Sequence, residues 1–174
     1  CEGLVGSEMC IRDRGNILAV GAPHDNTYPS NTYLNSQTTG AGAVRVYEKI
    51  NGIWSQLGQT IYAEAQSDYF GGALSLSSDG SILAIGAKFN DDSGIDAGHV
   101  RMFENIGGTW IQIGQDIDGE AANDESGTSV SLSSDGSIVA IGAPTNDGNG
   151  FMSGHVRVFE NIFGVWIQIG QDIN

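Results

Sequence analysis

Two polar loops contain the side chains best suited to bind a metal ion. Both combine carboxylate and amide oxygens with glycines that allow sharp bends, which is what a weak extracellular calcium loop needs. The candidate ligands are Asn90, Asp91, Asp92, Asp96, Asn146, Asp147 and Asn149, and Asp25 and Asn26 hold the comparable place nearer the N-terminus. Asn, Asp and Gly also dominate ordinary turns for backbone reasons alone. The sequence therefore leaves two interpretations open, a calcium site and a solvated turn.

Three tryptophans, Trp54, Trp110 and Trp166, are evenly spaced along the chain. An exposed indole that recurs in this way can stack on sugar rings, which predicts a carbohydrate-binding surface. A buried indole would instead fill the gap between neighbouring repeats. Solvent exposure of Trp110 and Trp166 would therefore favour sugar binding, and their burial would exclude it.

Histidine recurs at the interval that separates the tryptophans. His99 and His155 hold matching positions, Ala43 holds the comparable position in the first unit, and His24 stands alone. We expect a structural role for the repeated pair, such as a hydrogen bond to a neighbouring loop. A zinc or catalytic site needs three convergent ligands or a nucleophile beside a base, and the sequence reveals neither. Phosphate-binding glycine motifs are absent too. The sequence therefore predicts a protein that is not an enzyme.

Arginine recurs two residues before an aromatic side chain. The three pairs are Arg45 and Tyr47, Arg101 and Phe103, and Arg157 and Phe159. Residues two apart on a strand lie on one face, so each guanidinium is expected near its ring, bonded to a carboxylate of the next unit. A clamp for an anionic ligand is the alternative. The acidic stretches 64–68 and 120–125 are interpreted as solvated loops between units.

The composition is acidic and rich in glycine. Among 174 residues there are 21 acidic against 7 basic side chains, 26 glycines and 3 prolines. A net charge of −14 argues against nucleic acid and anionic lipid as partners. No apolar run is long enough for a membrane-spanning helix. So many glycines indicate tight turns and short strands.

Most of the chain consists of repeated units, whose length equals the interval from Trp54 to Trp110. Within one unit, short strands are expected at 72–77, 81–85, 100–103 and 110–113. Asp79 and Gly80 are predicted to form the positive-φ pair of a two-residue hairpin turn. The continuous apolar run Ile82–Ile85 suits a strand that is covered on both faces. Four short antiparallel strands per unit are typical of a β-propeller blade.

The repeat also resembles a known family. Phe70-Gly71-Gly72, followed by a strand, a turn and Ile85-Gly86-Ala87, resembles the FG-GAP repeat of integrin-alpha-like propellers. The resemblance implies an all-β fold, a partial β-propeller of about three four-stranded antiparallel blades, open rather than closed. Calcium-binding FG-GAP units carry several alternating acids in the first hairpin. The corresponding segments, 77–81 and 133–137, carry one acid each, so plain turns are expected there.

The N-terminal segment differs from the repeat. Residues 4–14 resemble the translation of a transposase adapter from sequencing libraries, so residues 1–14, with Cys1 and Cys10, are interpreted as non-native. Met9 and Ile11 alternate in a way that suits the empty inner-strand position of the first blade. The expected units are 15–58, an incomplete first blade, then 59–114, 115–170 and the start of a further repeat at 171–174.

Two functions remain possible. The first is a non-catalytic extracellular module for adhesion or scaffolding, of bacterial origin, which could contain weak calcium loops. The second is a lectin-like propeller that uses Trp54, Trp110 and Trp166. The expected partners are a protein or glycan at the cell surface and the remaining blades of a larger propeller, with no cofactor other than calcium.

Overall fold

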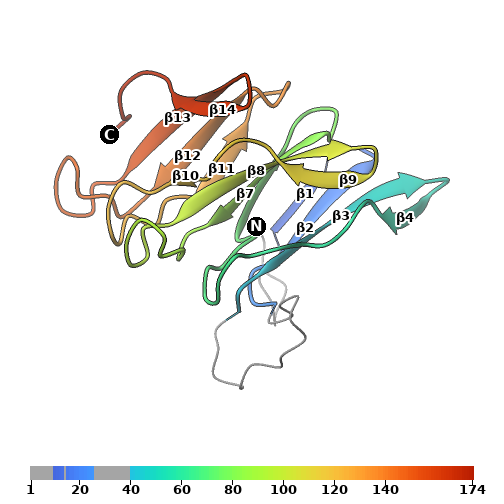
Figure 1. Cartoon of the computed structure of the whole chain (residues 1–174), viewed down its shortest axis with the longest axis horizontal. Coiled ribbons are helices and arrows are strands. Elements are labelled where there is room, and N and C mark those ends of the chain that lie inside the picture. Colours follow the sequence, from blue (N-terminus) through green and yellow to red (C-terminus); the bar gives the residue numbers. More distant parts are fainter. Residues whose placement is uncertain (1–9, 14, 26–39) are drawn as a thin grey trace.

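The computed structural model describes residues 10–13, 15–25 and 40–174. The described residues contain strands and turns but no helix. The strands form three antiparallel sheets that lie side by side (Figure 1), as expected for an open, partial β-propeller. None of the described segments is a helix with the length and hydropathy that a membrane crossing requires.

The first blade runs from β1 to β5. Its strands pair in the order β1, β2, β3, β4, and a short fifth strand pairs with the beginning of β3. The bounds are β1 (Cys10–Asp13), β2 (Ile17–Ala22), β3 (Ala43–Ile50), β4 (Ile53–Gln56) and β5 (Ile61–Tyr62). The inner-strand position, next to β2, is filled by β1, in which Ile11 lies opposite Val20. Met9 lies outside the described residues.

The second and third blades repeat this order. In the second blade the strands are β6 (Ala73–Leu76), β7 (Ile82–Ala87), β8 (His99–Ile106), β9 (Thr109–Gln112) and β10 (Ile117–Asp118). In the third they are β11 (Ser129–Leu132), β12 (Ile138–Ala143), β13 (His155–Ile162) and β14 (Val165–Gln168). Val156 pairs with Ile173 at the place where β10 pairs with β8 in the second blade. Both blades therefore have the same register.

The hydrophobic core lies between blades. One cluster joins the first blade to the second: it contains Val44 and Val46 of the first blade together with Leu83 and Phe103 of the second. A second cluster joins the second blade to the third. As predicted from the apolar run at 82–85, β7 is buried along almost its whole length. Its counterpart in the third blade, β12, alternates between buried and half-buried residues near its start, because only one of its faces is covered.

Close backbone contact between blades depends on glycine at one repeated position. A Cβ atom on Gly86 would lie 2.1 Å from the carbonyl oxygen of Gly127. The equivalent Gly21 faces the carbonyl oxygen of Gly71 in the same way. The glycines of the Gly-Ala strands thus allow the inner strands of neighbouring blades to meet at the propeller axis, where β6 contacts both β1 and β11.

The first hairpin of the second blade differs from the prediction. Only Gly80 has a positive φ, of 75°, whereas Asp79 is not left-handed. The N–H of Ser77 donates to the carbonyl of Ile82, so residues 78–81 form the loop, which is longer than the predicted two-residue turn. The reason is the side chain of Asp79, which accepts hydrogen bonds from the N–H and the hydroxyl of Ser81 and so stabilises the wider loop.

Candidate functional site

The junction between blades is built around a buried tryptophan. Trp110 and Trp166 are each only 3% exposed. The indole Nε1 of Trp110 donates a 3.0 Å hydrogen bond to the carbonyl of Leu57 in the preceding blade, and Trp166 makes the same bond to Ile113. Neither indole offers a face to a sugar ring. The prediction that Trp110 and Trp166 stack on sugars is therefore wrong, because both rings are buried in contacts between blades.

A glutamine completes each junction. The side chain of Gln59 donates to the carbonyl of Trp110 at 2.6 Å and accepts from its N–H at 3.1 Å. The side chain of Gln115 brackets Trp166 in the same way, at 2.8 and 3.4 Å. A primary amide has one acceptor oxygen and two donor hydrogens, so it can imitate a neighbouring strand. The edges of β9 and β14 are thus capped by the blades before them.

Trp54 occupies the same position in the first blade but is 40% exposed. All four residues of its strand, β4, are exposed, including Ile53. The ammonium group of Lys49 lies 5.8 Å from the centre of the Trp54 ring. The first blade therefore presents on its surface the face that is buried in the second and third blades.

The predicted calcium loops use many of their oxygen atoms to hold their own backbone. Asp91 accepts from the N–H of Asp96, and Asn90 from that of Asp92. In the third blade, Asp147 accepts from the N–H of Met152. Nothing in the structure tests whether these loops bind calcium, which stays a prediction.

The two asparagines that begin these loops are buried. Asn146 accepts from the N–H of Gly148 and donates to the Asp124 carboxylate, which also accepts from Ala121. Asn90 is equally buried in the second blade, whereas Asn149 is exposed. Both asparagines therefore brace the start of their loops.

The hairpin acids do not fit calcium. One oxygen of Asp79 accepts from the hydroxyl groups of Ser77 and Ser81 and from the N–H of Ser81. These hydrogen bonds lower the pKa of Asp79 to about 2. Asp135 has the equivalent bonds and the same shift. A single carboxylate that is already used in this way cannot supply the six to eight oxygens that calcium takes, so these segments are plain turns.

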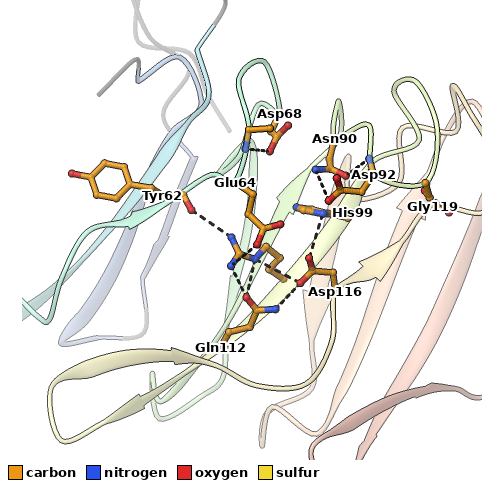
Figure 2. A network of polar contacts seen from close by, with 12 residues as sticks. Tyr62, Glu64, Asp68, Asn90, Asp92, His99, Gln112, Asp116 and Gly119 are labelled. Atoms are coloured by element: carbon orange, nitrogen blue, oxygen red, sulfur yellow. Dashed lines mark hydrogen bonds and ion pairs between the residues drawn. The ribbon is translucent and has the colours of Figure 1, made fainter. Parts of the chain in front are cut away.

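The structure assembles a different group of ligands around His99. Glu64, Asp92, His99 and Asp116 each offer a ligand atom within 4.8 Å of the others. His99 begins β8, Asp92 comes from the loop before it, Asp116 precedes β10, and Glu64 follows β5 at the exit from the first blade. Figure 2 shows Asp92 and Asp116 beside the His99 ring. Of the four aspartates predicted to bind calcium, only Asp92 belongs to such a group within the described part of the chain.

The same arrangement recurs in the third blade. Glu120, His155 and Asp172 form the second group, and each lies one repeat length after its counterpart. The Nδ1 atom of His155 is 3.7 Å from Glu120 and 3.8 Å from Asp172. Gly148 stands where the second blade has Asp92, so this group has three ligands rather than four.

His99 does not make the hydrogen bond that we expected for the repeated histidines. The His99 side chain is fully buried, and neither of its ring nitrogens has a hydrogen-bond partner. Its Nδ1 lies 3.9 Å from an oxygen of Asp116, beyond hydrogen-bond distance. Burial lowers the pKa of His99 to about 4, although the carboxylate of Asp116 acts in the opposite direction. The imidazole is therefore neutral near neutral pH.

The repeated arginines lie beside these groups. The Arg101 guanidinium is 5.2 Å from the Phe103 ring, and Arg157 is the same distance from Phe159, as predicted. Arg101 pairs with Glu64 at 3.1 Å. Its Nε also lies 3.7 Å from Asp116, which begins the next expected unit, so the expected carboxylate of the next unit is present for Arg101. Arg45 and Arg157 instead pair with Asp25 and Glu120 of their own units.

One segment of the chain matches a known protein family. Residues 117–159 match the family model of the FG-GAP repeat. The matched segment extends from β10 to β13 and includes the hairpin, the Gly-Ala strand and His155. The FG-GAP resemblance is thereby confirmed for these residues, and the sequence repeat extends the same pattern into the second blade. The comparison with curated proteins gives no match.

The sequence did not reveal that Glu64, His99 and Asp116 lie together, because each is an ordinary residue in its own segment. Glu64 and Asp116 lie in polar connections that resemble solvated turns. The sequence alone predicts no convergent ligands, yet the fold brings these side chains together. The available signal was the shared interval, since all three residues recur one repeat length later.

Proposed function

We propose that the chain is a non-catalytic interaction module of the FG-GAP propeller type that acts outside the cell or at its surface. The FG-GAP match, the recurring blade junctions and the acidic composition support this proposal. Its partner is a protein, and in the first place other blades of the same type.

The observation that carries the proposal is the pair of free faces at the two ends of the sheet array. At one end, Trp54 is exposed, although Trp110 and Trp166 are buried in their junctions. At the other end, Ile169, Gly170 and Gln171 repeat the segment Ile113-Gly114-Gln115, which receives Trp166. Gly170 and Gln171 are exposed. The two faces are therefore complementary, and a blade with one face can bind a blade with the other.

A second copy of the chain serves as the probe of this interaction. Sedimentation velocity over a wide concentration range should show head-to-tail association that Trp54→Ala and Gln171→Ala each weaken. Phe151→Ala is the matched control, because Phe151 is an exposed aromatic residue in the loop between β12 and β13, outside the segments that form the two faces. A wild-type chain that stays monomeric, or a Trp54→Ala variant that associates like wild type, would contradict the proposal.

The proposal includes weak calcium binding by the loops at 90–96 and 146–149, with the oxygen-rich composition of these loops as its support. Thermal unfolding in millimolar calcium and in chelator tests it. A ligand that binds only the folded state raises the unfolding midpoint. An unchanged midpoint would remove calcium from the account.

A further inference from the structure

The two groups of histidine and carboxylates consist of other residues than the proposed association faces, although Asp172 directly follows Gln171. Their ligands gather at the beginning of β8 and of β13, whereas the association faces contain Trp54 and residues 169–171. Figure 2 shows the group of the second blade, in which Glu64, Asp92 and Asp116 approach His99 from three separate segments. A fold that gathers such side chains twice, in the same geometry, requires a physical explanation.

The buried imidazole of His99 is the first observation. An unpaired polar atom in the interior costs free energy, and buried polar groups are therefore nearly always hydrogen-bonded. Both nitrogens of His99 lack such a partner, and so does the Nε2 atom of His155. A neutral imidazole nitrogen without a hydrogen bond has a lone pair available to a metal ion.

The second observation is the spacing of the ligand atoms. The Nδ1 atoms of His99 and His155 are 3.7–3.9 Å from the nearest carboxylate oxygens. These separations are too long for hydrogen bonds. They are close to the distance between two ligands of a tetrahedral ion with bonds of about 2.1 Å, which is roughly 3.4 Å. Small side-chain shifts would bring the atoms into coordination.

The third observation is that each aspartate is oriented by a glutamine. Gln112 donates to Oδ1 of Asp116 at 2.5 Å, which leaves Oδ2 on the side of His99. Gln168 donates to Oδ1 of Asp172 at 2.8 Å, which leaves Oδ2 on the side of His155. Hydrogen bonds that fix a ligating carboxylate in this way are a regular feature of metal sites.

We propose that each group binds one divalent transition-metal ion, and that zinc is the ion that its imidazole and carboxylate ligands fit best. Calcium and magnesium prefer oxygen ligands alone, whereas imidazole suits zinc and its neighbours. In the second blade, the three carboxylates and Arg101 leave a net charge of −2, which one divalent ion neutralises. The four-ligand group of the second blade binds more tightly than the three-ligand group of the third.

The bound ion links segments that belong to different parts of the junction. Glu64 follows β5, which pairs with the first blade, and His99 begins β8 of the second blade. Asp116 precedes β10, which pairs with β8. Zinc therefore holds the connection between the first two blades against β8 and stabilises the junction. The first blade has Ala43 and Thr60 in place of the histidine and aspartate, so residues 10–13, 15–25 and 40–174 contain two such groups.

Isothermal titration calorimetry with zinc chloride tests the proposal on the full chain without an affinity tag. Cys1→Ser and Cys10→Ser are introduced throughout, because free thiols would bind zinc themselves. We expect two ions per chain, one in His99→Gln, one in His155→Gln and none in the double variant. His24→Gln is the matched control and should bind two, because His24 contacts Tyr69 and belongs to neither group.

Variants of the exposed glutamates test the sites without changing a buried side chain, in case the histidine variants fail to fold. Glu64→Gln and Glu120→Gln change side chains that are 42% exposed, and both should weaken zinc binding at least tenfold at their own site without loss of the β-sheet circular dichroism spectrum. Zinc should also raise the unfolding midpoint of wild type but not of the double histidine variant. The proposal is overturned if wild type binds no zinc, or if the double histidine variant binds two ions.

Discussion

The indole nitrogen of Trp110 donates a hydrogen bond to the carbonyl oxygen of Leu57, at 3.0 Å and across the boundary between two blades. The same bond recurs between Trp166 and Ile113. In each of these two repeats, one tryptophan side chain thus packs between two neighbouring sheets and also donates a hydrogen bond to a backbone carbonyl of the preceding blade.

The tryptophans should therefore contribute unequally to stability. Trp110→Ala should lower the free energy of unfolding by about 3–5 kcal/mol, since it leaves a cavity between two blades. Trp54→Ala, the matched surface change, should cost under about 1 kcal/mol. Urea denaturation followed by circular dichroism measures both. Equal losses would contradict the assignment of Trp110 to a packed junction.

The glycines of the Gly-Ala strands offer a second comparison. Gly86→Ala should destabilise the protein by about 1–3 kcal/mol or more, because its new Cβ would meet the backbone of Gly127 in the next blade. In the third blade, the nearest atom to such a Cβ on Gly142 belongs to the side chain of Ser129, which can rotate away. Gly142→Ala should thus cost clearly less in the same urea titration. The opposite order would show that the inner strands do not meet as described.

The hairpin acid Asp79 should make stability depend on pH. Hydrogen bonds from Ser77 and Ser81 lower its pKa from 3.8 to about 2, so the folded state favours the charged form. A folded-state pKa below the unfolded value means that the stabilisation is present above about pH 4 and is lost as the pH falls towards 2. The difference in unfolding midpoint between wild type and Asp79→Asn should shrink over this interval. A difference that stays constant from pH 5 to about 2 would exclude this role.

Arg101 should not be replaceable by lysine. Its guanidinium bonds to Gln112 and Glu64 and lies over the Phe103 ring, which a lysine ammonium cannot do at once. Arg101→Lys should lower the free energy of unfolding by about 1–2 kcal/mol. Lys49→Arg, on an exposed strand end, is the conservative control and should change little. Unaltered stability in Arg101→Lys would show that the contacts of the guanidinium with Gln112, Glu64 and Phe103 do not stabilise the fold.

The blade could be predicted because its information is local and repeated. The strand pattern, the Asp-Gly hairpins and the apolar run at Ile82–Ile85 lie within one repeat unit and recur in the next. Burial of Trp110 was one of two open alternatives, since its partners Leu57 and Gln59 belong to the preceding blade. A contact of this kind follows from the stacking of the sheets, which no single repeat encodes.

The ligand groups could not be predicted from any one segment. The surroundings of His99 come from three connections, and the polar loops that looked most like a metal site spend many of their oxygens on their own backbone. Proximity between Glu64 and His99 exists only once the β5 connection has crossed from one blade to the next. The repeat shows that Glu64, His99 and Asp116 each have an identical counterpart in the next unit. It does not show that the three side chains lie close together.

Acrylamide quenching of tryptophan fluorescence tests the repeating junction most directly. The account predicts one accessible tryptophan and two protected ones in dilute wild-type protein, because Trp54 is exposed and Trp110 and Trp166 are buried. Trp54→Phe should remove the quenchable, red-shifted component and leave the protected emission. If Trp54→Phe is quenched as readily as wild type, then Trp110 and Trp166 face solvent, and the blades do not pack through a common junction.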